Sequence, residues 1–224
     1  MKIIITGATG MIGEGVLLAT LNHPAITGIL MVNRRTSQLR HPKLSELIVK
    51  NFIDLDAHST QLTGYDGCFY CAGISSFGMN EEKYKHITFY TTMMFAQKLA
   101  DLNPHMTFFY LSGLYADSSE DGKIMWARVK GKTENALLKL RFRDVYSFRP
   151  GFIIPLKAQK NTRLIYKLLN LIYPFVFPNQ TLKYDEIATA LVRILESGCK
   201  EKILEIKDLK LIANQEYKGK TAKN

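Results

Sequence analysis

Hydrophobic residues in this chain come in short unbroken runs that alternate with longer stretches of helical spacing. Residues 3–5 are all isoleucine, and residues 28–33 are apolar except for the last. Such runs are typical of strands that are buried on both faces of a parallel sheet. Between them, residues 11–21 return to the spacing of a helix. This part of the chain therefore predicts a strand, a helix and a second strand.

The same alternation continues through the middle of the chain. Further apolar runs predict strands, and two stretches with apolar residues three or four positions apart predict helices. Strands that alternate with helices in this way predict an α/β protein with a doubly wound parallel sheet. The expected strands are 47–52, 67–73, 105–111 and 145–151, and the expected helices are 81–102 and 125–140.

The pattern changes after residue 151. Helices are expected at 162–172 and 185–197, and a short strand at 203–206. With 224 residues, 46% of them hydrophobic, the chain can bury one substantial core. We therefore expect a single domain over residues 1–212, which includes a small C-terminal cap at about 155–200, and a flexible polar tail at 213–224.

Three regularly spaced glycines, Gly7, Gly10 and Gly13, lie between the first strand and the first helix. A flexible turn is one explanation of such a triplet. The strand-turn-helix context favours another, in which Gly7 allows a tight bend, Gly10 lets the backbone approach a pyrophosphate and Gly13 lets the helix pack on the strand. The positive end of the helix dipole would face the phosphates. The pattern thus predicts a dinucleotide-binding Rossmann fold.

The end of the second strand bears on which dinucleotide binds. Sites for NAD usually place a carboxylate there to hold the ribose 2′-hydroxyl, whereas an arginine accommodates the 2′-phosphate of NADP. Here the strand ends in Asn33, Arg34 and Arg35. We therefore expect NADP, with NAD less favoured; the alternative for the two arginines is a solvated basic turn.

Charge and cysteine content limit the other possibilities. The formal net charge of +10 favours anionic partners, but the basic residues are spread along the chain, so we do not expect nucleic acid to bind. The chain has three cysteines, and this odd number argues against a disulfide framework. Cys68 and Cys71 fall in a predicted strand and point to opposite faces. The five histidines lack metal-ligand spacing, so no metal site is predicted.

No signal peptide and no apolar run long enough to span a membrane is evident in the sequence. A cytoplasmic protein is therefore expected. The apolar run 163–178 has alternatives: it could lie on a membrane surface, cover an apolar substrate, or pack in the core or a homodimer interface. Packing is favoured, because a cap on a sheet must bury an apolar face in any case.

An ordered set of motifs resembles the short-chain dehydrogenase/reductase superfamily. More narrowly, it is similar to the atypical NAD(P)-binding branch that contains epimerase-like and Tat-interacting-protein-like proteins. The resemblance covers about residues 1–200. The motifs are TGATGMIG at the first turn, Asp54-Leu55 after the third strand, CAG after the fourth, Ser112 after the fifth, Lys130 in a helix and RPGFI after the sixth strand.

This resemblance implies a role for each matching position. It implies a pyrophosphate site at Gly7, Thr9, Gly10, Met11, Ile12 and Gly13, a 2′-phosphate site at Arg34 and Arg35, and an adenine site at Asp54 and Leu55. The adenosine ribose would lie beside Cys71, Ala72 and Gly73, and the nicotinamide amide beside Pro150, Gly151, Phe152 and Ile153. The catalytic centre would contain Ser112 and Lys130, and the lysine would also bind the nicotinamide ribose.

The catalytic centre departs from the family pattern at one position. The family has a tyrosine four residues before the lysine, and this chain has Trp126 there. An indole donates a hydrogen bond but exchanges no proton at neutral pH, so Trp126 cannot be the general acid or base. Three explanations stay open: Tyr115 takes the role, water supplies the proton, or the protein binds cofactor without turnover. A strand-end cap for Ser112 and a solvated Lys130 are the simpler alternatives.

These patterns together predict an NADP(H)-binding protein of the atypical short-chain dehydrogenase type. An oxidoreductase or epimerase-like enzyme that acts on an unidentified small molecule is the first hypothesis. The alternative is a non-catalytic protein that senses NADP(H) and regulates a partner.

Overall fold

The computed structural model describes residues 1–52, 55–162, 172–177 and 180–214. The strands are β1 (Lys2–Thr6), β2 (Gly28–Asn33), β3 (Leu44–Ile48), β4 (Gly67–Tyr70), β5 (Thr107–Leu111), β6 (Asp144–Arg149), β7 (Phe152–Ile154), β8 (Thr181–Lys183) and β9 (Ile203–Glu205). The helices are α1 (Met11–Asn22), α2 (Glu81–Lys85), η3 (His86–Tyr90), α3 (Thr91–Leu102), α4 (Met125–Leu137), α6 (Tyr173–Val176), α7 (Tyr184–Ser197) and α8 (Ile206–Ala213), with short turns η1 (Leu55–His58) and η2 (Thr60–Leu62).

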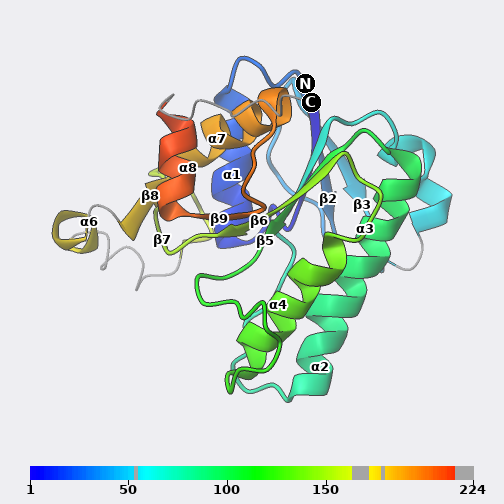
Figure 1. The fold of residues 1–224 in the computed structure, drawn as a ribbon. Helices are drawn as coiled ribbons and strands as arrows, with labels where there is room; N and C mark the ends of the chain where they lie inside the picture. The colour runs from blue at the N-terminus through cyan, green and yellow to red at the C-terminus, as the bar shows by residue number, and fades with distance from the viewer. Residues whose placement is uncertain (53–54, 163–171, 178–179, 215–224) are drawn as a thin grey trace, which may run out of the picture.

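Among the described residues, seven strands form one parallel sheet in the order β3-β2-β1-β4-β5-β6-β9. Strand β1 lies near the centre, with Ile5 opposite Met31 of β2 on one side and Phe69 of β4 on the other. The chain runs outward from β1 in both directions, so the strand order reverses between β1 and β4 (Figure 1). Ligands of open α/β sheets bind at such a reversal, beyond the carboxyl ends of the strands.

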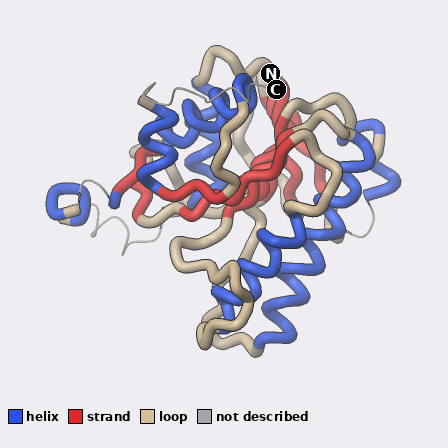
Figure 2. The backbone as a smooth tube through the Cα atoms, viewed as in Figure 1, coloured by secondary structure: helices blue, strands red, loops and turns tan. Residues whose placement is uncertain are grey.

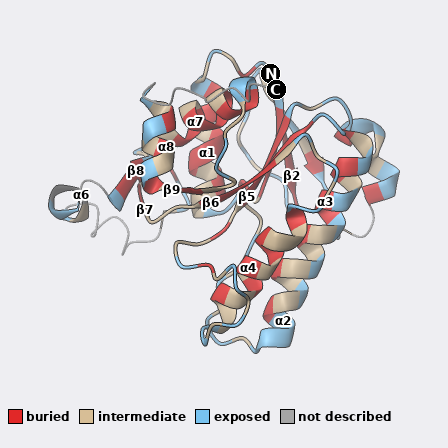
Figure 3. Cartoon of the chain, viewed as in Figure 1, coloured by how far each residue is buried: buried red, intermediate tan, exposed pale blue. Residues whose placement is uncertain are grey.

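Helices cover both faces of the sheet, as the sequence pattern predicted (Figure 2). Ile3 and Ile5 are buried in one core cluster with residues of α1 and α7, whereas Ile4 is buried in a second cluster with residues of α3. Neighbouring side chains of a strand point to opposite faces, so an unbroken apolar run is needed when both faces are covered. Figure 3 shows this burial along the central strands.

The long helical stretch predicted at 81–102 is present as α2, η3 and α3 in succession. It begins where the Asn80 side chain accepts a hydrogen bond from the Lys83 backbone nitrogen at 2.9 Å. The middle segment, η3, is a π-helical turn, which the periodicity did not predict. Tyr84 and Phe95 from this stretch are buried.

The third strand differs from its predicted position. It was expected at 47–52 and is found at Leu44–Ile48. Among the described strands, β3 is at the edge of the sheet and pairs with β2 alone, so its start is set by that partner: Leu44 lies opposite Ile29. The apolar run alone placed the strand too late, because Ser45 and Glu46 look like loop residues in the sequence.

The C-terminal part contributes to the main fold as well as to a smaller sheet. Strands β7 and β8 pair with each other, and β9 extends the main sheet next to β6. Helix α7 packs beside α1 on the same face of the sheet, followed by α8 (Figure 1). A cap was expected at 155–200, but α7, which lies in this range, belongs to the layer of helices that covers one face of the main sheet. Residues 163–171, which hold most of the predicted helix 162–172 and of the apolar run, lie outside the described residues.

A tyrosine from α7 fills the place of a side chain on α1. Tyr184 is buried, its hydroxyl donates to the Met11 carbonyl at 3.2 Å, and its ring lies against Gly15. A Cβ on Gly15 would be 2.2 Å from the ring. The absence of a side chain at Gly15 therefore lets the two helices approach closely.

We expect Gly15→Ala to lower the free energy of unfolding by about 1–3 kcal/mol, because the added methyl group overlaps the ring of Tyr184. In a Tyr184→Ala background the same substitution should be neutral or stabilising, since the ring is gone and alanine favours the helix. Urea denaturation of the wild type, the two single variants and the double variant measures this coupling. Gly28→Ala is the control, because its Cβ would meet only Cγ of Lys2, at an ordinary contact distance of 3.5 Å. Equal effects of Gly15→Ala in both backgrounds would contradict the assignment.

Candidate functional site

In the glycine turn between β1 and α1, Gly7 and Gly13 have no room for a Cβ. Gly7 has a φ of +65°, in the left-handed region, and its carbonyl accepts a hydrogen bond from the Gly10 nitrogen at 2.9 Å. A Cβ on Gly13 would be 2.2 Å from the Gly7 oxygen. Thr9 and Gly10 are exposed at the start of α1. The first backbone N–H groups of the helix are therefore available to an anion.

This turn is in contact with the chain that leaves β4. A Cβ on Gly7 would be 2.7 Å from the Ala72 nitrogen and the Cys71 carbonyl. The Thr6 hydroxyl accepts a hydrogen bond from that same Ala72 nitrogen at 3.1 Å. Cys71, Ala72 and Gly73 thus lie next to the glycine turn, where the strand order reverses.

At the end of β2, the structure places a carboxylate that the sequence analysis missed. Arg34 and Arg35 are exposed there, and Asn33 is buried. Glu46, from the neighbouring strand β3, accepts hydrogen bonds from the Asn33 side-chain nitrogen at 3.1 Å and the Ser37 backbone nitrogen at 2.7 Å. The sequence held no clear signal for this contact, because Ser45 and Glu46 interrupt the apolar pattern of the segment LSELI.

Ser112 and Lys130 lie around the end of β5. Ser112 is buried, its backbone nitrogen donates to the Phe148 carbonyl at 2.8 Å, and its hydroxyl oxygen has no partner among the described residues. Lys130 donates to the Leu111 carbonyl at 3.1 Å and lies 5.3 Å from the ring centre of Tyr110. Lys130 is therefore a partly buried, bonded side chain and not a solvated one.

The surroundings of Lys130 change its acidity. Burial lowers the pKa of the Lys130 ammonium from 10.5 to about 8, although Glu134 and Cys71 act in the opposite direction. A charged group that leaves water loses solvation, which favours its neutral form. Burial also raises the pKa of the Cys71 thiol, so the thiol is protonated at neutral pH. Cys71, which follows β4, and Lys130 on α4 lie close enough for the pKa of each to depend on the charge state of the other.

Trp126 packs next to Lys130, one helical turn before it on α4. A Cβ on Gly113 would be 3.1 Å from the Trp126 ring and 3.5 Å from the Lys130 side chain, so both side chains lie over Gly113. Tyr115 is 74% exposed. Its side chain extends into solvent, and the structure does not bring it together with Ser112 and Lys130.

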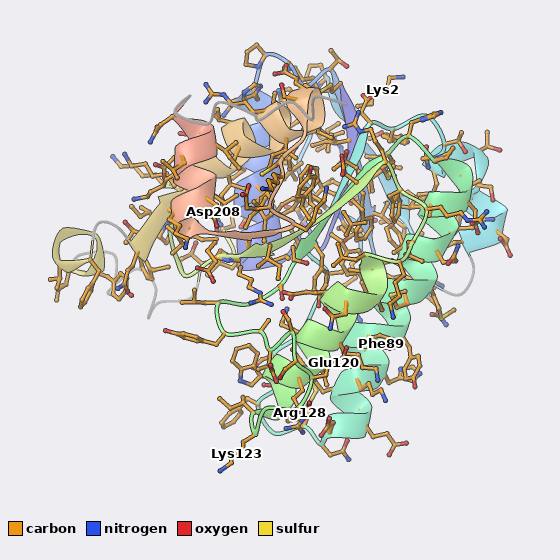
Figure 4. The ribbon with its side chains drawn as sticks, in the orientation of Figure 1. Lys2, Phe89, Glu120, Lys123, Arg128 and Asp208 are labelled. Atoms are coloured by element: carbon orange, nitrogen blue, oxygen red, sulfur yellow. The ribbon has the colours of Figure 1, made fainter. Side chains whose placement is uncertain are left out.

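The loop between β5 and α4 is held by polar contacts to the helix. Asp117 accepts from the backbone nitrogens of Ser119 at 3.0 Å and Gly122 at 2.7 Å. Arg128, labelled in Figure 4, donates to the Gly122 carbonyl at 2.5 Å and to Glu81 of α2 at 2.6 Å. These contacts fix the path of the chain that leaves Ser112.

A buried ion pair joins α4 to the end of β6. The Arg149 guanidinium binds both carboxylate oxygens of Glu134, which is 1% exposed, and also donates to the Ser118 hydroxyl at 2.6 Å. The hydrogen bonds to Glu134 raise the pKa of Arg149. Removing one member of such a pair leaves a buried charge, which is strongly destabilising. The pair therefore fixes α4, and with it Lys130, against the sheet.

The remaining predicted positions lie at the same edge of the sheet or in the core. Pro150 and Gly151 follow β6, and a Cβ on Gly151 would be 2.7 Å from Cδ1 of Ile206, so that side chain would have to move. Phe152 and Ile153 are buried. Leu55 is 2% exposed in the cluster with α3, so its side chain offers little surface to an adenine. Asp54 lies outside the described residues.

A short segment after β7 is attached to the start of α1, and the sequence gave no indication of it. Gln159 donates to the Met11 carbonyl at 2.6 Å. Glu14 accepts hydrogen bonds from the backbone nitrogens of Lys160 at 3.0 Å and Asn161 at 2.8 Å. The chain at 159–161 therefore lies beside the first turn of α1.

Within the described ranges, no group of three or more histidine, cysteine, aspartate or glutamate side chains could hold a metal ion. In the same part of the chain, no helix is long and apolar enough to cross a bilayer.

Known proteins resemble this chain in sequence and in fold. Protein fmp52-1, mitochondrial, from Aspergillus terreus is 26% identical over 162 residues, which are 68% of this chain and 66% of the relative. WbmF from Bordetella bronchiseptica, solved in complex with NAD+, has a TM-score of 0.63 at 14% identity, and the match covers 98% of this chain and 79% of that one.

A short chain dehydrogenase family protein from Francisella tularensis has a TM-score of 0.64 at 16% identity, and the match covers 93% of this chain and 98% of that one. At these identities the structural matches establish the fold alone. The sequence profile described as "NAD dependent epimerase/dehydratase family" matches residues 3–124, more than half of the chain. The chain therefore belongs to the NAD dependent epimerase/dehydratase family.

Proposed function

We propose that this protein binds NADP(H) along the carboxyl edge of its parallel sheet and acts as an oxidoreductase or epimerase-like enzyme on a small molecule. The glycine turn is the observation that carries the proposal. Gly7 and Gly13 each lack room for a Cβ, and the exposed start of α1 directs backbone N–H groups to the place where the strand order reverses. A pyrophosphate fits both the charge and the close backbone approach at this place.

The choice of NADP(H) rests on the end of β2. Arg34 and Arg35 are exposed and adjacent, one strand away from the glycine turn. Arginine forms charge-assisted and often bidentate hydrogen bonds with phosphate. Asn33 brings no negative charge to this position. The Glu46 carboxylate at this strand end accepts hydrogen bonds from Asn33 and Ser37, so the two exposed cations favour a ribose that carries a 2′-phosphate.

We expect NADPH to bind about tenfold or more tightly than NADH, which corresponds to ~1.5 kcal/mol or more of charge-assisted hydrogen bonding. An Arg34→Ala, Arg35→Ala double variant should lose this preference while it retains affinity for NADH. Isothermal titration calorimetry with both cofactors measures it. Lys123→Ala, in the loop before α4, is a control that removes one exposed positive charge elsewhere. Equal affinities in the wild type would exclude the 2′-phosphate site.

The chemistry of the site depends on Ser112, Lys130 and Trp126. NADP(H), when bound, supplies or accepts a hydride. The Ser112 hydroxyl is buried without a partner among the described residues, so it can donate a hydrogen bond to a substrate oxygen. Lys130 brings a positive charge to the same strand end. Trp126 has no exchangeable proton at neutral pH, so no side chain at this position serves as the general acid.

We therefore expect slow reduction of generic aldehydes, quinones and ketones by the wild-type protein. A general acid accelerates such reactions by about 10²–10⁴-fold, so Trp126→Tyr should raise the rate if Ser112 and Lys130 are already in place. Trp126→Phe is the matched control, since it differs from Trp126→Tyr only by the hydroxyl group. NADPH oxidation over a substrate panel is the measurement.

Tyr115→Phe, Ser112→Ala and Lys130→Ala separate the alternatives in the same assay. Fast wild-type turnover that Tyr115→Phe abolishes would show that this exposed tyrosine moves into the site. Fast turnover that none of the three substitutions changes would refute the proposed centre.

The low pKa of Lys130 predicts a characteristic dependence of stability on pH. Above pH 8 the folded protein loses the proton of Lys130, whereas the unfolded chain keeps it up to about pH 10.5. Between these values the unfolded state binds more protons, so the free energy of unfolding rises with pH. Relative to Lys130→Met, wild type should gain on the order of 1 kcal/mol per pH unit in this window.

Urea denaturation between pH 7 and 10 tests this expectation, with both proteins measured in the same buffers. Lys132→Met, two positions further along α4, is the control, because its side chain is 41% exposed. Its stability should follow the wild type across the whole pH range. A constant difference between wild type and Lys130→Met would show that Lys130 has an ordinary pKa.

A second function, binding of NADP(H) without catalysis, is favoured by the lack of an evident proton donor at the site. Trp126 stands where a proton donor would be needed, and the side chain of Tyr115 extends into solvent. A protein that binds NADP(H) without turnover and regulates a partner would need the glycine turn but no donor. Tight NADPH binding without turnover on any substrate in the panel would favour this function. We also propose a cytoplasmic location, because three cysteines, an odd number, suit a reducing compartment in which disulfides do not form. The fungal relative, in contrast, is named as a mitochondrial protein.

A further inference from the structure

We propose that the substrate of this protein is an uncharged, mainly apolar carbonyl compound or the corresponding alcohol. Apolar side chains of the loops after β4 (residues 71–80) and after β5 (residues 112–124) would bind its hydrocarbon part. This inference rests on the proposed function, because it assumes that the reaction takes place at the carboxyl edge of the sheet. It adds the substrate class, which the proposed function leaves open.

The chain at this edge of the sheet is uncharged over three separate stretches. Charged residues make up 22% of the sequence, but residues 67–80, 111–116 and 150–156 contain none. These stretches include or follow the ends of β4, β5 and β6, which are neighbours in the sheet. The strand ends around Ser112 are therefore continued by chain that offers a ligand uncharged groups.

Each of the two loops has an aromatic side chain near the tip of a turn. Phe77 lies in a turn closed by a backbone hydrogen bond of 3.1 Å between residues 76 and 79, and it is 93% exposed. Tyr115, also exposed, lies in a turn closed by a backbone hydrogen bond of 2.9 Å between residues 113 and 116. Because β4 pairs with β5, the two loops start from adjacent strands.

A third exposed apolar side chain, Ile124, directly precedes α4 and is 54% exposed. Ile124 is four positions before Arg128, and Phe77 is four positions before Glu81. Arg128 donates to Glu81 at 2.6 Å, which joins the start of α4 to the start of α2. The segments that carry Phe77 and Ile124 therefore enter two helices that are in contact. Large apolar side chains that gather on an exposed surface are typical of a binding site.

Trp126 connects these loops with the proposed catalytic centre. Its ring lies over Gly113, the residue directly after Ser112, and beside Lys130. The Trp126 side chain is neither buried nor fully exposed, so part of it is available for contact. An indole has a large apolar surface and one polar group, its N–H. A substrate with its oxygen near Ser112 would place its hydrocarbon part against the Trp126 ring.

Several charged side chains of the same region are bonded to other groups or point away. Asp117 accepts from backbone nitrogens of its own loop, and Arg128 binds Glu81. Lys123 points away from the sheet (Figure 4). An apolar substrate gains free energy when it leaves water for such a surface, whereas a charged one loses hydration. The surface therefore favours an apolar substrate.

Trp126 is the one tryptophan of the chain, so its fluorescence reports binding without turnover. Titration of the wild type with 2-pentanone, 2-heptanone and 2-nonanone, in the presence and absence of NADP+, should change the Trp126 emission. Affinity should rise by about tenfold for each two added CH₂ groups, since one fully buried CH₂ is worth about fourfold. UDP-glucose, a charged probe rich in hydroxyl groups, should bind more weakly than 2-nonanone in calorimetric titrations.

Variants of the two loops test which side chains bind the hydrocarbon part. Phe77→Ser and Ile124→Ser should each weaken the binding of 2-nonanone by about three- to tenfold and change that of 2-pentanone less, because the longer chain reaches further from the centre. Both side chains are exposed, so the variants should fold, as thermal unfolding checks. Met94→Ser is the matched control, because Met94 is an exposed apolar residue on α3. Affinities for 2-nonanone that match the wild type in both variants would overturn the assignment.

The outcomes separate this inference from the proposed function. If NADPH binds but the ketones do not, or if their affinity does not rise with chain length, the substrate class is refuted while the nucleotide site stands. Tighter binding of UDP-glucose than of 2-nonanone has the same consequence. A dimer in light scattering that Phe77→Ser dissociates would show that the apolar surface joins two copies of the chain, which also refutes the substrate class. If the ketones bind as expected and neither NADPH nor NADH binds, the proposed function fails and the apolar surface stands.

Discussion

The site depends on a close approach of backbone to backbone at Gly7. The turn after β1 lies against Cys71 and Ala72 on one side and against Gly13 on the other, with no space for a Cβ at either contact. A side chain at Gly7 or Gly13 would separate α1 from the sheet or β1 from the end of β4. The helix N-terminus would then no longer face the place where the strand order reverses.

Polar groups buried at the strand ends determine how precisely the surrounding side chains are held. Glu134 and Arg149 attach α4 to β6, and Glu46 orients Asn33 at the end of β2. Each of these contacts joins different elements of the chain, so each fixes one element relative to another. Ser112 and Lys130 are then presented by rigid elements, which is a requirement for a binding or catalytic site.

The fold and part of the site could be predicted from the sequence because they follow from local patterns. The unbroken isoleucines of β1 indicated a strand covered on both faces, and Gly7, Gly10 and Gly13 indicated the turn. The edge strand β3 was displaced because pairing with β2, and not hydrophobicity, sets its start. Glu46 was missed for the same reason, since its partner Asn33 is distant in sequence. The orientation of Tyr115 and the pKa of Lys130 depend on burial, which no local pattern contains.

The contacts of the Met11 carbonyl also affect the order in which the protein can be completed during synthesis. This oxygen accepts hydrogen bonds from Gln159 and Tyr184, which are 148 and 173 positions away. A ribosome adds about 5–20 residues per second, so on the order of ten seconds or more separates α1 from these partners. During this interval α1 lacks the ring that covers Gly15, and its apolar face has no α7 to pack against. The glycine turn is therefore synthesised well before the contacts that hold the start of α1 in place.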